Sequence, residues 1–379
     1  MKIIKNKENL FSIIKNSNNL IISSDGSGTE KLNLIDLYSN SNKPLFITHD
    51  PSGNLFEMYN DILEEKGYKV ECFNSGETLK SISYNPLKLI DELYNNKNFD
   101  EAYELTKKLT YAIYFDPLEK DKFWQLSSMA LVNSVILAMI SNSDVLLSLN
   151  DVIEFIENLG VLEDKNIKNK LDQYFENTLI GRLEYKKISQ LGIDTKKEML
   201  FYAINKLKKF NIISDITSNN TIELENICFG DKPVAIFLTT PKFEELSNIF
   251  INQVYYILKK ENLLPESVGY KREIIFNLDE FSNIPPIERI NNIIPLCLAK
   301  GIKFNIVIKS LPKLEKIYGE NFQTILNNCG NLIYISSDDD KTNSYVSGGL
   351  DLDLNSFREN NEMIILSHIN RCIFRCKLA

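Results

Sequence analysis

The chain has 379 residues, of which 44% are hydrophobic and 25% are charged, so it is long enough to form one large α/β domain or two smaller domains, each with a buried core. This composition excludes collagen-like proteins, disulfide scaffolds and wholly disordered chains. With 43 lysines and arginines against 51 acids, the net charge is -8, which excludes an overall basic surface for nucleic acid or for an anionic membrane. A polyanionic partner would have to bind a local patch.

The cysteines, the histidines and the hydropathy of the chain exclude further classes of protein. Six scattered cysteines and the lack of a signal peptide indicate a reducing, cytoplasmic setting. Only two histidines occur, His49 and His368, and there is no Cys-x-x-Cys pair, which argues against a zinc site and against a histidine-dependent hydrolase. The most apolar run, residues 129–140, is shorter than the roughly 20 residues of a membrane span. We therefore expect a buried helix there and no transmembrane segment.

The first part of the chain alternates between strand and helix patterns. Strand patterns occur at residues 19–23, 44–48 and 68–73, and a helical pattern occurs at residues 55–66. This alternation predicts βαβ units and a mainly parallel sheet. From about residue 89 to residue 210 the pattern changes to long amphipathic helices, for example at residues 99–114, 121–140 and 149–159. We therefore expect an all-α domain inserted into an α/β domain.

Strand patterns return in the last third of the chain. Predicted strands lie at residues 234–239, 273–277, 304–308 and 332–335, and predicted helices at 243–261, 286–300 and 314–328. A final antiparallel pair is expected at residues 363–366 and 372–377. The organisation that we predict is an α/β domain in two parts, residues 1–90 and 213–379, with the all-α domain of residues 91–212 between them.

A glycine-bearing turn follows the first predicted strand, in the sequence IISSDGSGTEKL of residues 21–32. Backbone N–H groups at the start of a helix bind phosphates, and the full phosphate-loop motif is Gly-x-x-x-x-Gly-Lys-Ser/Thr. The residues that remain of this motif are Gly26, Ser27 and Gly28. Thr29 stands where the lysine belongs, and Glu30 stands where the magnesium-binding hydroxyl belongs. Lys31 comes two positions late, and about 200° of helical rotation would turn its side chain away from the phosphates.

Two later strands end in polar residues. Residues 274–281, IIFNLDEF, end in a pair of acids; in phosphate-loop motors the first, Asp279, holds Mg²⁺ through water and the second, Glu280, polarises the attacking water. The alternative is that Asp279 caps the next helix and Glu280 is solvated. The next buried strand ends in Lys309 and Ser310, where a solvated lysine is the alternative.

Taken together, these segments resemble the motor domain of the coupling proteins of conjugation and type IV secretion, the TraG/TraD type. The resemblance covers residues 19–366 and rests on an ordered set of stretches. They are Asp50, Pro51 and Gly53; Asn85, Pro86 and Leu87; Phe123 and Trp124; VAIFLTTP at residues 234–241; LDEFSNIPPI from Leu278; the stretch from LAKGIKF to Asn331; and the turn of Asp340, Lys341 and Thr342 with Ser347.

The resemblance implies a RecA-like P-loop NTPase fold with a mainly parallel central sheet and an inserted all-α domain. Members are similar to hexameric DNA-translocating ATPases that hold nucleotide between subunits, so ATP and Mg²⁺ are the implied cofactors. The implied partners are DNA, relaxase-bound or single-stranded, and other components of the secretion system, in a homo- or hetero-hexamer. Carried over by position, the loop residues Gly26, Ser27 and Gly28 would bind phosphate, Asp279 would hold Mg²⁺, Glu280 would activate water, and Ser310 follows the strand-end glutamine position.

The departures from the family pattern concern the groups that stabilise the transferring phosphate. Thr29 and Glu30 replace the lysine and the hydroxyl, Lys309 replaces a glutamine, and Leu298 and Lys300 stand where arginines are usual. A P-loop lysine makes charge-assisted hydrogen bonds worth about 1.5–3 kcal/mol each, and an arginine finger is worth about 10³–10⁵ in rate. The family usually carries N-terminal membrane helices, whereas about 18 residues precede the first predicted strand here.

These departures lead to more than one function reading. The first is a soluble, cytoplasmic pseudo-ATPase or adaptor, held at the inner face of the membrane through partners, which binds nucleotide weakly or does not hydrolyse it. The alternative is an active translocase motor in which Lys309 replaces the missing lysine, because the strand that ends in Lys309 is expected between the loop strand and the acid-bearing strand. A decayed remnant is a third reading, against which the intact core strands argue. Lysines between residues 165 and 209 could bind DNA or be a solvated face.

Overall fold

The computed structural model describes residues 3–4, 12–40, 43–160, 174–175, 181–262, 272–348, 354, 362–368 and 372–378. Its strands form one ten-stranded sheet in the order β1-β10-β9-β8-β2-β7-β6-β3-β5-β4. The strand bounds are β1 Ile3–Ile4, β2 Asn19–Ile22, β3 Leu45–His49, β4 Lys69–Asn74, β5 Val234–Thr239, β6 Ile274–Leu278, β7 Ile302–Ile308, β8 Asn331–Tyr334, β9 Glu362–Ser367 and β10 Cys372–Lys377. The strands from β8 to β4 are parallel to their neighbours, which confirms the mainly parallel sheet predicted from the sequence.

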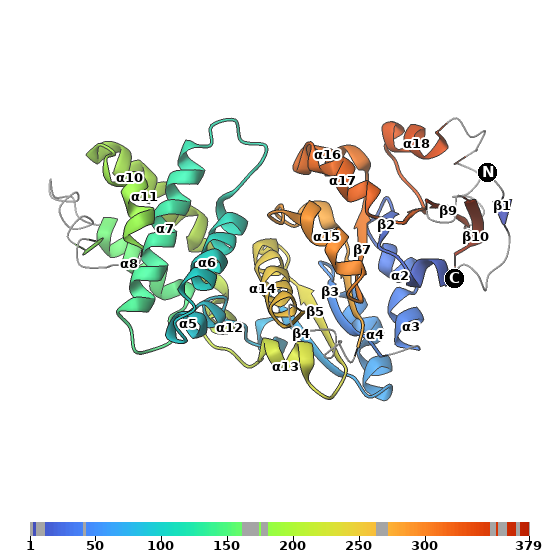
Figure 1. Ribbon diagram of the computed structural model, residues 1–379, viewed down its shortest axis with the longest axis horizontal. Helices are drawn as coiled ribbons and strands as arrows, with labels where there is room; N and C mark the ends of the chain where they lie inside the picture. The colour runs from blue at the N-terminus through green and yellow to red at the C-terminus, as the bar shows by residue number, and fades with distance from the viewer. Residues whose placement is uncertain are drawn as a thin grey trace.

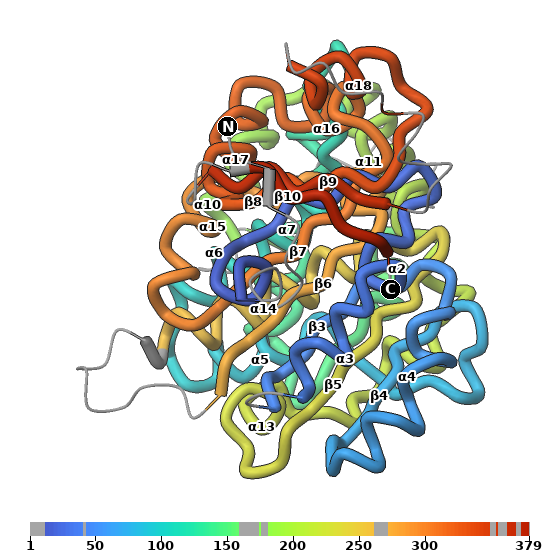
Figure 2. Tube along the Cα trace, turned by 90° about the vertical axis from the view of Figure 1, so that its right-hand side faces the viewer, coloured from blue at the N-terminus to red at the C-terminus, as the bar shows by residue number. Residues whose placement is uncertain are grey.

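The C-terminal strands extend the sheet on the β8 side. Strand β9 pairs antiparallel with both β8 and β10, as expected for the final pair, and the short strand β1 pairs with β10. Figure 2 shows β9 and β10, in dark red, beside β8. Both chain termini lie at this end of the molecule (Figure 1). The sequence pattern did not predict β1, which has only two residues.

Helices cover both faces of the sheet. Their bounds are α2 Gly28–Lys31, α3 Leu34–Ser39, α4 Asn54–Glu65, α14 Glu244–Asn262, α15 Ile290–Leu298, α16 Leu311–Tyr318, α17 Asn321–Asn327 and α18 Asp340–Ser347. Alternate residues of a strand point to opposite faces. In β2, Leu20 and Ile22 join a large core with residues of α14 and α15, while Ile21 joins a smaller core with residues of α3 and α4. Burial on both faces explains why the parallel strands are continuous apolar runs.

The described elements between β4 and β5 are all helical. They are α5 Lys88–Asn95, α6 Phe99–Tyr114, α7 Phe123–Ser141, α8 Leu149–Gly160, α10 Arg182–Ser189, α11 Ile193–Leu207, α12 Ser214–Thr217 and α13 Leu224–Phe229, with short 3₁₀ turns at Thr78–Lys80 and Lys208–Ile213. Figure 1 shows α7, α8, α10 and α11 gathered at the end of the molecule opposite the chain termini. This arrangement supports the proposal that the helices form an inserted all-α domain.

Helix α7 is the centre of the helical part. Among the described residues it is the one helix that is long and apolar enough to cross a membrane, and 72% of its apolar window is buried inside the protein. It packs against α6, α10 and α11. A helix that is apolar on every side is the type expected at the centre of a bundle, and it contains the buried helix predicted at residues 129–140.

Two helix predictions near the C-terminal half are wrong in their bounds. The predicted helix at 314–328 is two helices, α16 and α17, because Gly319 adopts a left-handed φ of 52° between them. The predicted helix at 286–300 begins only at Ile290. Pro285 and Pro286 restrict the preceding backbone to extended conformations, and the 3₁₀ turn Phe281–Asn283 comes before them.

A row of buried amides crosses five neighbouring strands on the face that carries α3. Asn331 of β8 donates to Asn19 of β2 at 2.8 Å, and Asn19 donates to Asn305 of β7 at 2.7 Å. Asn305 donates to Asn277 of β6 at 2.8 Å, and Asn277 donates to Thr48 of β3 at 3.4 Å. These five residues are fully buried and lie opposite one another in the strand register. A slip by one residue would break the row, so it fixes the register.

The amide row predicts a large effect of substitution at its centre. Asn305→Ala removes the donor to Asn277 Oδ1 and one acceptor of the Asn19 amide, so we expect the free energy of unfolding to fall by about 2–4 kcal/mol. Urea unfolding followed by circular dichroism measures this. Asn327→Ala, on the exposed side of α17, is the control, with an expected change below about 0.5 kcal/mol. Equal stability of the two variants would show that the row contributes nothing.

Candidate functional site

The candidate site lies where the parallel strands β8, β2, β7, β6 and β3 end. The carboxyl ends of parallel strands meet at one edge of a sheet, where ligands of α/β proteins bind. Strand β7 lies between the loop strand β2 and the acid-bearing strand β6, as expected. The polar residues that follow β2, β6 and β7 in the sequence are therefore brought together.

The loop after β2 needs both of its glycines. Gly26 has a left-handed φ of 80°, and a Cβ there would lie 2.6 Å from Glu280 Cγ and 3.0 Å from Lys309 Cε. A Cβ on Gly28 would lie 2.6 Å from Ile21 Cγ2 and 2.8 Å from Val307 Cγ1. Gly28 therefore lets α2 start directly against β2 and β7, and Gly26 lets the side chains of Glu280 and Lys309 pack onto the loop. Ser27, between them, is the N-cap residue of α2.

Thr29, and not Glu30, faces the acid that was predicted to hold magnesium. Thr29 Oγ1 donates to Asp279 Oδ1 at 2.5 Å, and both side chains are buried. The predicted placement of Glu30 at the hydroxyl position is therefore wrong. Because α2 begins at Gly28, the first helical side chain to reach β6 is that of Thr29. The hydroxyl that contacts Asp279 is therefore that of Thr29.

Glu30 lies on another side of α2. Its charge acts on Tyr59, whose pKa is raised to about 12 mainly by burial, with smaller contributions from Asp36 and Glu30. The carboxylate of Glu30 is half-buried. Glu30 therefore adds negative charge near the start of α2. Among the described residues, no hydrogen bond or ion pair joins Glu30 to Asp279 or Glu280, the acids that follow β6.

Lys31 reaches back to the loop, contrary to the prediction that it turns away. Its Nζ lies 2.6 Å from Asp25 Oδ2 and 3.4 Å from Ser23 Oγ. Helix α2 has only four residues, so the flexible lysine side chain spans it and returns to the loop. Asp25 Oδ1 also accepts hydrogen bonds from Ser23 Oγ at 2.6 Å and from the backbone N–H of Ser27 at 3.2 Å.

The ion pair of Lys309 and Glu280 covers the loop from the other side. Lys309 Nζ lies 2.9 Å from Glu280 Oε1. Glu280 Oε2 accepts a hydrogen bond from Asn283, whose Oδ1 in turn accepts one from Lys313 Nζ at 2.5 Å. Glu280 has a left-handed φ of 50°, which is uncommon for a residue with a side chain. Ser310 is the N-cap residue of α16, and its hydroxyl makes no capping hydrogen bond.

The sequence patterns gave no role to His49, the last residue of β3, or to Asp50, which follows it. His49 Nδ1 hydrogen-bonds to the backbone oxygen of Asp279 at 2.6 Å, and burial lowers the pKa of His49. Burial raises the pKa of Asp50, although hydrogen bonds from the backbone of Phe56 and neighbouring residues oppose this. The signal that could have found them is that two polar residues end another strand at the same sheet edge.

Asp279 is the most strongly perturbed acid of the site. Burial raises its pKa well above the ordinary value, hydrogen bonds from Thr29 act in the opposite direction, and the charge of Asp50 raises the pKa further. A buried carboxylate is costly unless a cation or several donors compensate it. Binding of a proton or of a cation would therefore remove the cost of burying the charge of Asp279.

The raised pKa of Asp279 predicts a pH-dependent effect on stability. The folded protein binds this proton more tightly than the unfolded chain, so the free energy of unfolding falls as pH rises above about 3.8. Asp279→Asn removes the charge and keeps an acceptor for Thr29. We expect the variant to be more stable than the unmodified protein at pH 8, by about 1–3 kcal/mol, with a smaller gain at pH 5. Urea unfolding at both values measures this.

The control for this prediction is Asp61→Asn, because Asp61 is exposed. Its effect on stability should be small and the same at the two pH values. A gain for Asp279→Asn that does not grow between pH 5 and pH 8 would contradict the assignment of Asp279 as the buried, proton-retaining acid.

Comparisons with known proteins identify the family. Residues 40–350 match the family described as type IV secretory system conjugative DNA transfer; the glycine loop precedes this range. The bacterial conjugative coupling protein TrwBdeltaN70 in complex with sulphate has a TM-score of 0.71 at 13% identity, over 96% of this chain and 86% of that chain. TrwB in complex with ADP and Mg²⁺ has a TM-score of 0.70 at 14% identity, over the same shares of the two chains.

A more distant likeness is to VirB4 of Thermoanaerobacter pseudethanolicus, with a TM-score of 0.53 at 12% identity, over 97% of this chain and 90% of that chain. At these identities the structural matches show the fold, which is the α/β P-loop NTPase fold expected from the sequence. No curated protein matches the chain. Since the family match covers most of the sequence, the chain belongs to the type IV secretory system conjugative DNA transfer family of coupling proteins.

Proposed function

We propose that this chain is a coupling-protein-like subunit of conjugative DNA transfer that acts as a pseudo-ATPase or adaptor, binding nucleotide weakly or without hydrolysis. The observation that carries the proposal is that three backbone donors of the glycine loop, those of Ser24, Gly26 and Ser27, already have partners within the protein. In an active phosphate loop these backbone N–H groups and a lysine are directed at the phosphates.

Three backbone donors of the loop have acceptors within the protein. The N–H of Ser24 donates to Ser336 Oγ at 3.2 Å, and the N–H of Gly26 donates to the Ser23 oxygen at 2.9 Å. The N–H of Ser27 donates to Asp25 Oδ1 at 3.2 Å, and the Thr29 hydroxyl donates to Asp279. A phosphate would have to replace these internal acceptors before it could bind, which supports weak affinity.

The charges of the loop are balanced in the same way. Lys31 pairs with Asp25, and Lys309 pairs with Glu280. Each lysine is thus neutralised by an acid, while Glu30 adds a further negative charge. The residues present do not fit a triphosphate in this arrangement. They fit Mg²⁺ better, because Asp279 and the hydroxyl of Thr29 are oxygen ligands of the kind it prefers, but two such groups do not make a complete site.

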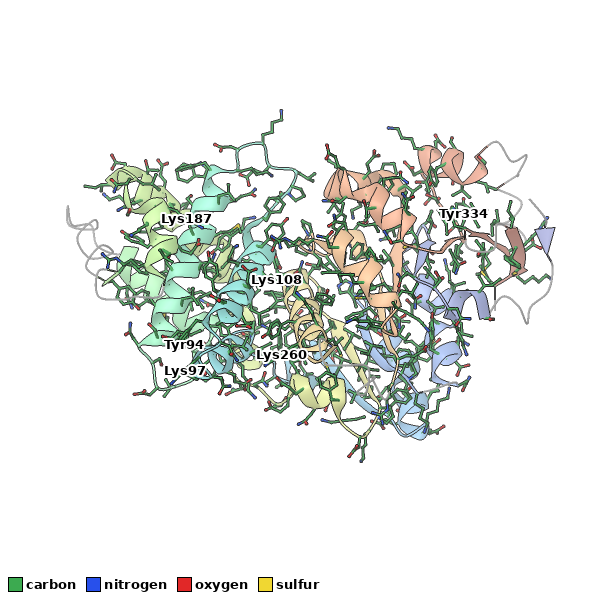
Figure 3. The ribbon with its side chains drawn as sticks, viewed as in Figure 1. Tyr94, Lys97, Lys108, Lys187, Lys260 and Tyr334 are labelled. Atoms are coloured by element: carbon green, nitrogen blue, oxygen red, sulfur yellow. The ribbon has the colours of Figure 1, made fainter. Side chains whose placement is uncertain are left out.

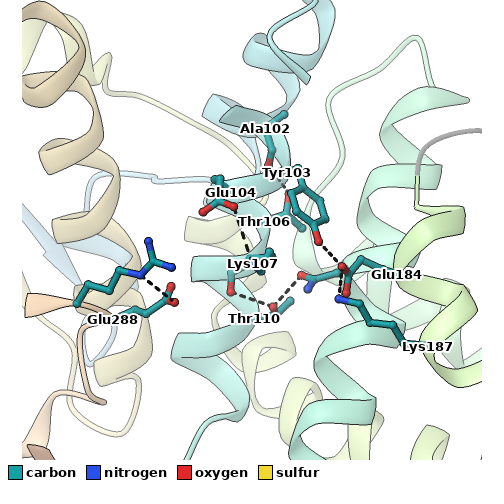
Figure 4. A network of polar contacts seen from close by, with 11 residues as sticks. Ala102, Tyr103, Glu104, Thr106, Lys107, Thr110, Glu184, Lys187 and Glu288 are labelled. Atoms are coloured by element: carbon teal, nitrogen blue, oxygen red, sulfur yellow. Dashed lines mark hydrogen bonds and ion pairs between the residues drawn. The ribbon is translucent and has the colours of Figure 1, made fainter. Parts of the chain in front are cut away.

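The proposed partners are components of the secretion system and DNA, in a homo- or hetero-hexamer in the cytoplasm. The lysines of the helical part are a poor DNA surface, because several are paired. Lys187 pairs with Glu184, as Figure 4 shows together with Tyr103, Lys208 pairs with Glu157, and Lys209 pairs with Glu245. These ion pairs argue against a strongly basic DNA-binding face on these helices.

A second reading, an active translocase motor, is favoured by one observation. The position of β7 beside β2 brings Lys309 over the loop, with its Cε 3.0 Å from where a Gly26 Cβ would lie. If Lys309 left Glu280, its ammonium group could replace the missing lysine and Glu280 would be free to act on water. The two readings differ in hydrolysis and in the role of Lys309.

The adaptor reading predicts no specific ATP turnover. We expect the purified protein to release phosphate no faster than Glu280→Gln, both with and without single-stranded DNA, because the loop lacks a free cation. A phosphate-release assay on the two proteins measures this. DNA-stimulated hydrolysis that Glu280→Gln abolishes would instead establish the motor reading.

The role of Lys309 gives a separate prediction. If Lys309 only neutralises Glu280, Lys309→Ala should change the affinity for MgATP by less than about threefold, since a half-exposed ion pair is worth little. The matched control is Lys316→Ala, on the exposed side of α16. A loss of affinity of about tenfold or more for Lys309→Ala alone, in a calorimetric titration, would mean that Lys309 binds the phosphates.

A further inference from the structure

We infer that Asp25 is an internal anion of the glycine loop: its carboxylate binds the donors that a phosphate would take, and it thereby determines the low affinity of the loop for phosphate-bearing ligands. The inference rests on the proposed function, in which the loop binds nucleotide weakly, and names the residue responsible. It goes beyond the missing lysine, because it assigns an occupant to the loop.

Three different donors converge on the Asp25 carboxylate. Lys31 Nζ lies 2.6 Å from Oδ2, Ser23 Oγ lies 2.6 Å from Oδ1, and the backbone N–H of Ser27 lies 3.2 Å from Oδ1. An ammonium group, a hydroxyl and a loop N–H are the kinds of donor that a phosphate loop offers to its ligand. The Asp25 carboxylate therefore accepts the same kinds of hydrogen bond from this loop that a phosphate oxygen accepts from a complete phosphate loop.

The ionisation of Asp25 agrees with this geometry. Burial by itself would raise the pKa of Asp25, but the hydrogen bonds from Lys31, Ser23 and Ser27 outweigh it and hold the pKa below the usual range. At neutral pH the group is a carboxylate, and it is the nearest negative charge to the loop N–H groups at Ser27. Any anion that enters the loop meets this charge first.

An ordinary loop aspartate would explain part of the pattern, because aspartates often accept a hydrogen bond from the residue two positions on. The contact with Lys31 is the part that this does not explain. It uses the cation closest to the loop in sequence, which would otherwise be available to a phosphate. Asp25 thus neutralises the charge of Lys31, and removal of the carboxylate makes the ammonium group of Lys31 available to a phosphate.

The exposure of the pair sets the size of the effect. The side chains of Asp25 and Lys31 are 52% and 31% exposed, so water and salt screen their interaction. Asp25 therefore competes with a ligand for the loop donors, and a ligand can displace it. Removing one unit of repulsion at this exposure corresponds to an affinity gain of about fivefold.

The test is a calorimetric titration of the full chain with MgADP at low ionic strength. Asp25→Asn keeps the shape and removes the charge, so we expect its affinity for MgADP to be about fivefold higher than that of the unmodified protein. Asp25→Glu keeps the charge and should show no gain. Adding Lys31→Ala to Asp25→Asn should abolish the gain, because Lys31 is the cation released.

The matched control is Asp36→Asn. Asp36 of α3 forms a similar ion pair outside the loop, with Lys66 at 2.6 Å, and its replacement changes the net charge by the same amount. Affinity that is unchanged in Asp25→Asn, or that rises equally in Asp36→Asn, overturns the inference. Such a result leaves the adaptor function standing, whereas DNA-stimulated hydrolysis by the unmodified protein would overturn that function whatever Asp25 does. Circular dichroism melting curves confirm that each variant is folded.

Discussion

The row of buried amides across β8, β2, β7, β6 and β3 is the constraint on which the site depends. Each amide is fully buried and bonded to the next, so the five strands are held at one height. Their carboxyl ends then fall at one edge, and the residues that follow them meet there. Without this common register, the contact of Thr29 with Asp279 and that of Lys309 with Glu280 would not form.

The polar groups gathered at this edge largely satisfy one another. Opposite charges pair at the loop, Asp25 accepts the N–H of Ser27, and the ring of His49 hydrogen-bonds to the backbone oxygen of Asp279. In a site that binds a strongly charged ligand, the donors that face the ligand have no partner within the protein, and this lowers the stability of the empty site. These internal contacts support the proposed adaptor function of a chain with the coupling-protein fold. In Figure 3, Lys97 and Lys187 lie on the helical part of the molecule, and Tyr334 of β8 lies at the other end.

Much of the fold can be predicted from the sequence, because long apolar runs and helical periods indicate strands and helices wherever they pack. The buried strands, the antiparallel pair at the end and the helical insertion are all visible as runs and periods. The place of β7 beside β2 came from the family resemblance and not from periodicity. Gly319 shows the limit, since one left-handed residue divided a continuous helical pattern into α16 and α17.

The site was less predictable, because it depends on where a short helix begins. Counting positions along the phosphate-loop motif assumed a loop of standard length, which placed Glu30 against the acids. The start of α2 at Gly28 placed Thr29 there and let Lys31 return to Asp25. The central claim, that the protein's own groups close this loop, is tested most directly by hydrogen–deuterium exchange of a peptide spanning residues 20–33, with and without MgATP. We predict little or no added protection of this peptide by MgATP; strong protection would contradict the account.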